Sequence, residues 1–358
     1  NMPWLPTLGY NTNLIYPSQQ NAKTYNSIFN PMHSYGSANL INITSGSIDE
    51  YDFNVSGNIN DVLYWGLSLN LTSIDYHLES HYSEDLHNIS VNDNSKSGVN
   101  PSTTDGRYTL SNYLLTKGCG TGVKLGVIFR PINMLRIGLA VHSPTIYQLS
   151  DVYSAAVEYE FDKVDGHRLA GSASDMDNQT DIGQIEYQFT SPWHFLGSMA
   201  FVLNKLGIVS VDYEYIAANN MFYSDVYADY STTNSYISQQ VIPVHNVRVG
   251  SEFRITPLVS ARLGYVYESS PIKQDIYIGN EAPLIAEGTL CNYQVPGDAH
   301  NISCGLGYRI NNFSIDAAYV YRMQDYSIFA YEGALMGTSE TIMNLQNHSI
   351  KLTLGVRF

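Results

Sequence analysis

Apolar and polar residues alternate with a period of two along most of this chain. At the C-terminus, Ile350, Leu352, Leu354, Val356 and Phe358 are separated by polar or small residues. Successive side chains of a β-strand point to opposite faces, so this alternation predicts a strand with one apolar and one polar face. The same pattern predicts about eleven strands from Tyr51 to Phe358. Among them are 51–59, 63–71, 107–130, 135–142, 184–203, 209–215, 247–254, 259–267 and 313–322, with 107–130 and 184–203 each taken as one long, kinked strand.

The predicted connections between these strands alternate between two lengths. Tight links fall at 60–61, 131–133, 204–205, 256–257 and 311–312. Long polar links fall at 81–106, 150–183, 217–242, 271–298 and 325–345. Short turns at one rim and long loops at the other are typical of a membrane barrel. The sequence therefore predicts an all-β fold, a transmembrane antiparallel β-barrel.

Charged residues recur on the polar face of the predicted strands. The clearest are Arg130, Arg136, Arg248, Arg262, Asp212, Glu252 and Asp316. Unpaired charges are too costly to bury in a dry core, so we expect these side chains to face a hydrated lumen and the apolar face to contact lipid. Tyrosines near strand ends, such as Tyr213, Tyr265 and Tyr319, are typical of an interfacial aromatic belt. The alternative is a soluble β-sandwich with a hydrated outer face.

Composition narrows the classes of function. The 358 residues carry 18 Lys+Arg and 33 Asp+Glu, a formal net charge of −15, which argues against nucleic-acid binding. No run reaches the roughly 18 consecutive apolar residues of a membrane-spanning helix. Catalytic and dinucleotide motifs are absent from the sequence, so we expect no enzyme, cofactor or metal ion. A disulfide between Cys291 and Cys304 is left open.

The C-terminal residue, Phe358, ends an alternating strand, as is typical of barrels in the outer membrane of Gram-negative bacteria. Such barrels have even numbers of strands. One strand near 8–16 would give about twelve strands in this chain, and further strands upstream would give about fourteen in the complete protein. We therefore divide the chain into an N-terminal strand and loop region, 1–46, and a barrel, 47–358.

Several segments resemble the FadL-type family of outer-membrane transporters for long-chain fatty acids and aromatic hydrocarbons, in its Bacteroidetes-like form. They are VIFRP at 127–131, LRIGLAVHSPTIY at 135–147, SPWHFLGSMA at 191–200 and SVDYEY at 210–215. The resemblance implies a fourteen-stranded barrel, an N-terminal hatch in the lumen, and ligands that leave sideways through a kinked strand. The Asn-Pro-Ala signature of the hatch is not found in this sequence, so we expect the hatch to precede it.

Aromatic residues in two predicted loops are candidates for ligand capture. They are Phe222, Tyr223, Tyr227, Phe329 and Tyr331. The alternative is that these rings pack the loops together. The lumenal arginines likewise have two roles open to them, since they can bind a carboxylate head group or pair with lumenal acids to brace the wall.

Pro144 and Pro192 interrupt otherwise continuous strands, where the missing N–H breaks the hydrogen-bond ladder. They either open a lateral gap for ligand or mark where strands bend into loops. The sequence thus predicts a barrel for passive uptake of hydrophobic or amphipathic small molecules, such as fatty acids or aromatic compounds, surrounded by outer-membrane lipids or detergent. The alternative function is an accessory subunit that binds a partner protein through its long loops during secretion or surface-protein handling.

Overall fold

The computed structural model describes residues 4–18, 24–30, 34–91, 102–164, 167–174, 183–204, 206–226, 228–273, 293–329 and 340–357. Most of them lie in β-strands. The strands of the N-terminal half are β1 (Ile15–Pro17), β2 (Tyr25–Ser27), β3 (Phe29–Asn30), β4 (Tyr35–Ile59), β5 (Leu63–Val91), β6 (Ser102–Ile132), β7 (Leu135–His142), β8 (Ile146–Val164) and β9 (His167–Ser174). Those of the C-terminal half are β10 (Gly183–Thr190), β11 (His194–Leu203), β12 (Gly207–Ile216), β13 (Phe222–Ser224), β14 (Val244–Arg254), β15 (Val259–Glu268), β16 (Tyr293–Ile310), β17 (Phe313–Phe329) and β18 (Thr341–Val356). The helices are α1 (Trp4–Asn11), η2 (Ala218–Asn220) and α2 (Ser231–Gln240).

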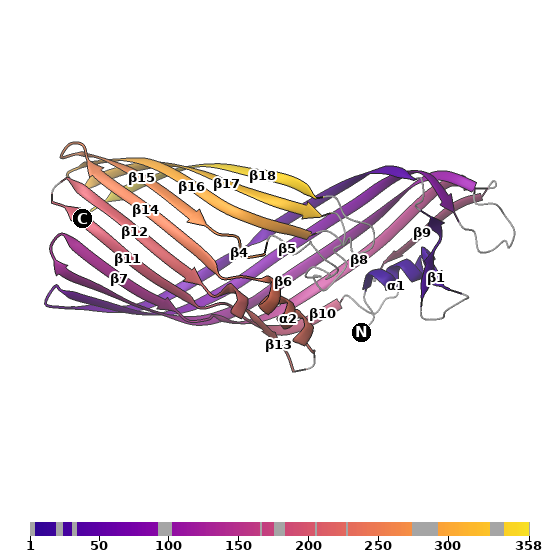
Figure 1. The fold of residues 1–358 in the computed structure, drawn as a ribbon, viewed down its shortest axis with the longest axis horizontal. Coiled ribbons are helices and arrows are strands. Elements are labelled where there is room, and N and C mark those ends of the chain that lie inside the picture. The colour runs from indigo at the N-terminus through magenta and orange to yellow at the C-terminus, as the bar shows by residue number, and fades with distance from the viewer. Residues whose placement is uncertain are drawn as a thin grey trace.

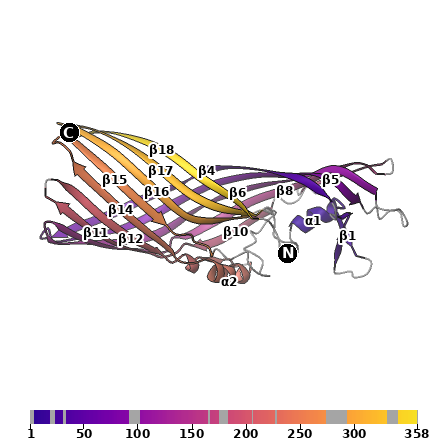
Figure 2. The same ribbon diagram turned by 45° about the horizontal axis from the view of Figure 1, so that its top comes forward.

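One antiparallel sheet forms the body of the molecule. Its strands pair in the order β4-β5-β6-β7-β11-β12-β14-β15-β16-β17-β18. The sheet curls around a central space (Figures 1 and 2). Within the described residues β4 and β18 each pair with one strand of this path, so the curled sheet is open between them. The described chain has eighteen strands in all, more than the twelve or so predicted for it, because segments outside this path also form strands. The all-β antiparallel fold is confirmed.

The predicted tight links all lie at one end of the curled sheet. Asn60 and Asp61 have φ values of 53° and 55°, which fits the two-residue turn that matches strand twist. Asn204 and Asn311 have similar positive φ values, of 52° and 48°. Asparagine tolerates this left-handed region better than most residues. We call this end the turn end of the sheet.

All five predicted long connections contain strand residues, and two of them consist mainly of strand. Residues 81–91 and 102–106, expected in a loop, extend β5 and β6, while 150–164 and 167–174 form most of β8 and all of β9. With β3, β10 and β13 these segments form a second part of the same sheet, which projects beyond the curled part (Figure 1). We call this part the protruding sheet; it also includes β4 up to Asp49, β5 from Ser73 and β6 up to Thr121.

β6 joins the two parts because its two halves have different neighbours. Residues 106–121 pair with β8, and residues 124–132 pair with β7. The predicted strand 107–130 is therefore continuous, whereas the predicted strand 184–203 is divided into β10 and β11. The division at 191–193 faces the division at 143–145 between β7 and β8, because both sides keep one register.

This register places Pro144 opposite Pro192, so two residues without an N–H face each other in adjacent strands. Serine hydroxyls replace part of the lost ladder. Ser143 Oγ accepts from the Val123 N–H at 2.9 Å, and Ser191 Oγ accepts from the Thr145 N–H at 2.8 Å. Neither proline marks the start of a long loop, since β8 and β11 follow them directly. The proposed lateral gap at this break stays a prediction.

The N-terminal prediction was wrong at two points. The strand expected near 8–16 is mainly helix α1, and β4 begins at Tyr35, so the predicted division between 46 and 47 falls inside a strand. α1 packs on the protruding sheet, where Leu8 is buried against Leu110 and Val157. Within the described residues, no helix combines the length and apolar character needed to cross a membrane.

We expect Leu8→Ala to detach α1 from the protruding sheet. Leu8 is 2% exposed, and removing a buried leucine side chain costs about 2–5 kcal/mol. Hydrogen exchange of the amides in 8–17 should become much faster, while exchange in β14 and β15 stays unchanged. Leu206→Ala is the matched control because Leu206 is 68% exposed. Equal protection of 8–17 in the wild type and Leu8→Ala would contradict the packing.

Candidate functional site

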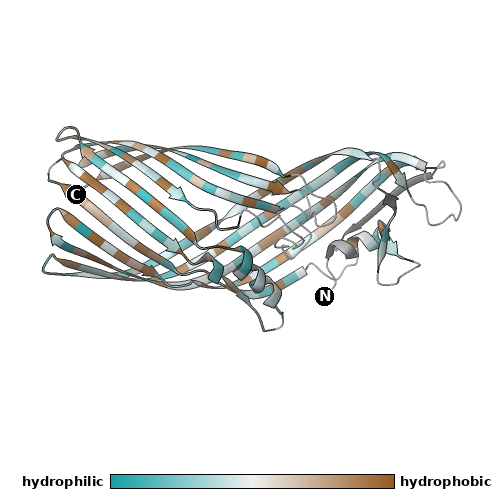
Figure 3. Cartoon of the chain, viewed as in Figure 1, coloured by the Kyte–Doolittle hydropathy of each residue, from teal (hydrophilic) through white to brown (hydrophobic). Residues whose placement is uncertain are grey.

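The outward positions of the curled sheet are mainly apolar on every strand. Figure 3 shows the alternation of apolar and polar residues along these strands. Representative side chains are Leu67 on β5, Val127 on β6, Val249 on β14, Leu263 on β15, Leu306 on β16 and Leu352 on β18, exposed by 36% to 67%. Between the turn end and the protruding sheet, the described outward positions of all eleven strands hold no Asp, Glu, Lys or Arg. This exposure of large apolar side chains is the reverse of a water-soluble surface.

The concave face of the same strands is polar and more enclosed. Lys124 on β6 reaches Glu50 and Asp52 on β4, passing over β5. Ser68 and Asn70 on β5 are 9% and 3% exposed, although both are polar. Contacts that pass over an intervening strand require side chains to converge, so this is the inner face of the curl.

The polarity of the two faces inverts in the protruding sheet. The outward positions of β5 change from Leu69 and Leu71 to Asp75, Glu79 and Asp85. Asp85 accepts two hydrogen bonds from Arg107, at 2.6 and 2.8 Å, and this guanidinium lowers the pKa of the carboxyl. The inner face becomes apolar, with Val157, Tyr159 and Phe161 buried. The outward apolar surface is therefore a band of limited height.

Two rows of aromatic residues border this band. The lower row, near the turn end, contains Phe129, Phe201, Phe253, Tyr308 and Phe313, exposed by 42% to 60%. The upper row contains Trp193, Phe195, Tyr213, Tyr215, His245, Tyr265, Tyr267, His300, Tyr319, Tyr321 and His348. On four strands the two rows are nine residues apart, counting both ends: 193–201, 245–253, 300–308 and 313–321.

The seven charged residues singled out from the sequence all lie at inner positions of the curled sheet. Arg262 on β15 connects two of them, since it pairs with Glu252 on β14 at 2.8 Å and with Asp316 on β17 at 2.5 Å. Arg130 donates to Asn133 at 2.6 Å. Arg136 lies on β7 at the same face. The structure thus joins three of the seven in one ion-paired group and places the others on separate strands.

Sequence reasoning missed the most buried ionic group, which centres on Glu214. Its carboxylate is 8% exposed and accepts from Asn246 at 3.2 Å, contacts His194 Nδ1 at 2.9 Å and pairs with Arg248. Arg248 therefore pairs with Glu214, although Asp212 is its direct register partner. The signal was present in the sequence, because Glu214 lies two residues after Asp212 and so shares its face.

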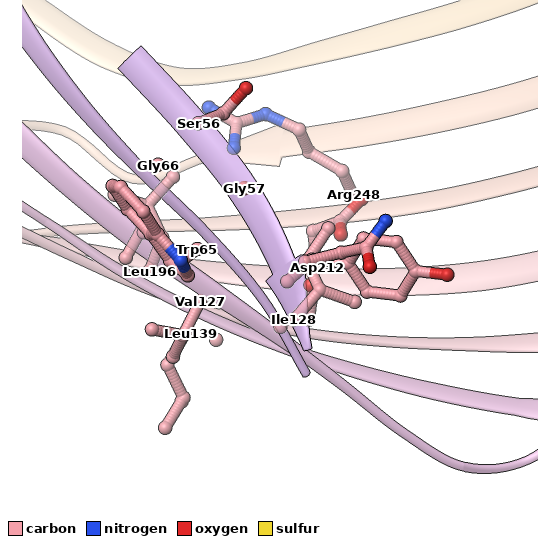
Figure 4. Close-up of a pocket in the computed structure, with 17 residues that line it drawn as sticks. Ser56, Gly57, Trp65, Gly66, Val127, Ile128, Leu139, Leu196, Asp212 and Arg248 are labelled. Atoms are coloured by element: carbon pink, nitrogen blue, oxygen red, sulfur yellow. The ribbon is translucent and has the colours of Figure 1, made fainter. Parts of the chain in front are cut away.

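A cavity of about 760 Å³ opens on the inner face near the turn end. Its floor is formed by β4, β5, β6, β7 and β11. The inward positions of these strands hold small residues that leave the backbone uncovered: Ser56, Gly66, Gly126, Gly138, Ala140 and Ser198. Tyr64, Ile128 and Leu196 add apolar surface, and Asp212 with Arg248 lies at one side, away from Trp65 and Leu139 (Figure 4). The cavity thus combines apolar walls with one charged edge.

A cluster of aromatic rings lies on the inner face above the proline break. Phe189 and Tyr223 have ring centroids 4.9 Å apart, Tyr147 lies 6.1 Å from Phe189, and Tyr187 and Tyr230 complete the cluster. Burial raises the pKa of Tyr187, which lies beside Asp151. These side chains come from β8, β10, β13 and the start of α2.

The loop aromatics predicted for ligand capture are thus distributed over different environments. Tyr223 joins the inner aromatic cluster, and Phe222 on β13 is 50% exposed. Phe329 is 2% exposed and packs against Val295, so it does not form an open surface. Tyr227 and Tyr331 lie outside the described residues, as does Cys291. Cys119 and Cys304 are both exposed, free cysteines.

Comparisons with known proteins give little further information. No protein-family model matches the sequence, and no curated protein matches it. Among solved structures, the chain is similar to the P. putida toluene transporter TodX, with a TM-score of 0.38 and 10% identity over 91% of this chain and 90% of that one. A likeness of this size decides neither the fold nor the function of this chain.

We expect Glu214→Ala to destabilise the fold more than Glu252→Ala does. Glu214 has three partners and is 8% exposed, so its loss should lower the free energy of unfolding by about 2–3 kcal/mol. Glu252 is 49% exposed and shares Arg262 with Asp316, so its loss should cost less than about 1 kcal/mol. Reversible denaturant unfolding followed by tryptophan fluorescence measures both values. Equal losses of unfolding free energy in the two variants would show that the buried Glu214 group stabilises the fold no more than the exposed Glu252 pair does.

Proposed function

We propose that this protein spans the outer membrane of a Gram-negative bacterium as the wall of a β-barrel and provides a passive route for hydrophobic or amphipathic small molecules. The observation that carries the membrane part is the band of outward apolar side chains free of Asp, Glu, Lys and Arg. An Arg or Lys facing lipid at the bilayer midplane of a barrel costs about 2–4 kcal/mol, so such a band is what lipid contact requires. A soluble sheet would need its apolar face covered by a second layer.

The height of the band supports the same proposal. A membrane-spanning β-strand needs about 9–11 residues when it is tilted. The two aromatic rows are nine residues apart on β14, β16 and β17 and from Trp193, just before β11, to Phe201, and tyrosine and tryptophan prefer the level of the lipid head groups. Beyond the upper row, charged residues such as Asp75 and Asp85 occupy outward positions, as expected for a part that stands in water.

The inner face suggests how a small molecule could pass. The aromatic cluster around Tyr223 and Phe189 provides apolar contacts at the mouth, above the membrane. The cavity near the turn end provides apolar walls from Ile128 and Leu196 below it. Arg248 at the edge of this cavity already donates to Glu214, so a solute carboxylate would have to compete with Glu214 for it and the site favours solutes that are mainly apolar. No covalent step is required for such a passage.

Two native cysteines test the membrane placement. Cys304 lies in the outward band between Leu263 and Tyr319, whereas Cys119 lies outward in the protruding sheet opposite Gln148. In a Cys291→Ser background reconstituted into phospholipid nanodiscs, a charged maleimide should modify Cys119 readily and Cys304 very slowly. Mass spectrometry of the tryptic peptides measures both rates.

Unfolding the same sample in denaturant is the control, since both thiols should then react equally. A bilayer shields Cys304 but leaves Cys119 in water, so the ratio of the two rates reports the environment and not the reagent. If Cys304 reacted as fast as Cys119 in the folded, reconstituted protein, the membrane placement would be wrong.

A pair of glycine variants tests the route. Gly66 faces the cavity and Gly197 faces outward, and a Cβ built at either one has no neighbour nearer than 3.9 Å. Gly66→Phe should therefore fill the cavity and slow uptake of a fluorescent fatty acid several-fold in bacteria that express the full-length protein. Gly197→Phe should leave uptake unchanged because its ring points to lipid.

Surface quantity and heat-modifiable gel mobility should be equal in the two variants, which excludes a folding defect. Equal uptake by Gly66→Phe, Gly197→Phe and the wild type would contradict passage through this cavity. Two results together would favour the accessory-subunit function instead. The wild type would not increase uptake of any hydrophobic probe, and a partner protein that binds the protruding sheet would co-purify with it.

A further inference from the structure

The upper aromatic row contains the same arrangement three times. A Tyr-x-Tyr sequence on one strand meets a histidine on the next: Tyr213 and Tyr215 with His245, Tyr265 and Tyr267 with His300, and Tyr319 and Tyr321 with His348. In each copy the first tyrosine hydroxyl is hydrogen-bonded to Nδ1 of the imidazole. These distances are 2.7, 2.9 and 2.6 Å.

The second tyrosine of each copy packs against the same imidazole. The ring centroids of Tyr215 and His245 are 5.5 Å apart, those of Tyr267 and His300 are 5.5 Å apart, and those of Tyr321 and His348 are 4.8 Å apart. Each histidine is thus held between two tyrosines on the outward face. Three identical pairs at one level of the sheet indicate a shared role that packing alone does not require.

The hydrogen bond leaves one donor free in every pair. When the tyrosine O–H donates to Nδ1 of a neutral imidazole, the ring proton lies on Nε2, which can donate. When Nδ1–H donates to the phenol oxygen, the tyrosine O–H can donate instead. Either arrangement therefore presents an N–H or O–H donor at the edge of the apolar band.

The position of the row determines what can accept from these donors. If the band lies in a bilayer, as the proposed function states, the upper row lies at the level of the lipid head groups. Phosphate oxygens are the strongest acceptors available there, because hydrogen bonds to charged groups are about twice as strong as neutral ones. The lower row offers fewer donors, since it contains Phe129, Phe201, Phe253 and Phe313, with only Tyr308 and the nearby Trp65 able to donate among the described residues.

We propose that the three tyrosine–histidine pairs bind the phosphate groups of lipid molecules in the leaflet next to the protruding sheet. The pair at His245 is the best placed, because none of its described contacts is acidic. These contacts are Tyr213, Tyr215 and Ser269. The pair at His300 binds phosphate less well, because Asp298 accepts from the neighbouring Tyr267 at 2.8 Å and lines a hollow of about 530 Å³ with His300 and Asp325. The surface therefore selects lipids by head group at one side of the membrane only.

Native tryptophans report on the two leaflets separately. Trp193 lies in the upper row, because it stacks on Phe195, which contacts Tyr215 beside His245. Trp65 lies near the turn end and is 40% exposed. With Trp4 and one of these two replaced by Phe, the other is the single tryptophan of this chain. Quenching by lipids with brominated acyl chains then compares phosphatidylglycerol with monogalactosyldiacylglycerol, which carries no phosphate.

We expect Trp193 to show a preference for the phospholipid of about two- to twelvefold, the range that a net hydrogen bond supports. The double variant Tyr213→Phe/His245→Phe keeps both aromatic rings and removes the imidazole nitrogens together with the phenol hydroxyl that His245→Phe alone would leave free to donate, so it should abolish this preference. Trp65 should show no preference in either protein. Tyr265→Phe, in a different pair, is the matched control and should leave the Trp193 result unchanged.

Each other outcome would overturn the proposal. An equal preference at Trp65 would assign the selectivity to the whole membrane surface, and an unchanged preference in Tyr213→Phe/His245→Phe would assign it to other groups. If Trp193 were quenched by both lipids without preference, the membrane placement would stand and the phosphate site would not. If neither lipid quenched Trp193 or Trp65, the membrane placement itself would be wrong.

Discussion

A single-layer β-sheet has no interior of its own, so the direction in which a residue points decides what it contacts. This constraint controls the whole molecule. Along β5, the outward positions change from leucine to acidic residues after Leu71, while the inward positions change from Ser68 and Asn70 to the buried Tyr82. The backbone is the same extended strand throughout. Only the character of each face has changed, from apolar outside and polar inside to polar outside and an apolar packed surface inside.

The period of two made most of the curled sheet predictable from the sequence. β12, β14, β15 and β17 have strict alternation and are bounded by turns with Asn or Pro, so both their existence and their faces follow directly. The protruding sheet was not predictable in this way. Residues 81–91 and 102–106 are rich in polar side chains on both faces, and their pairing depends on the partner strand and on α1, which a sequence pattern does not reveal. The short apolar run near Leu8 fits a strand or a helix equally well.

The candidate site was likewise predictable only in part from the sequence. Alternation placed Arg248, Arg262 and Asp316 on one face, but the identity of each ionic partner depended on register and side-chain length. Arg248 has Asp212 directly opposite and still pairs with Glu214, which is more enclosed and has His194 and Asn246 beside it. The tyrosine–histidine pairs required the same knowledge. Tyr213 and His245 are 32 residues apart in the chain, and the diagonal contact exists only because β12 and β14 pair with Tyr215 opposite His245.

The polar inner face is compatible with a route for apolar molecules because its charges are largely neutralised in pairs. Lys124 pairs with Glu50 and Asp52, Arg262 with Glu252 and Asp316, and Arg322 with Glu268, so these charges are held against the wall. An apolar molecule that passes them does not strip water from an isolated ion, which would be costly. Between these pairs, the small residues at Gly66, Gly126 and Gly138 leave the central space wide. Bracing the wall and leaving room within it are therefore two results of one arrangement, in which long side chains are tied down and the remaining positions are small.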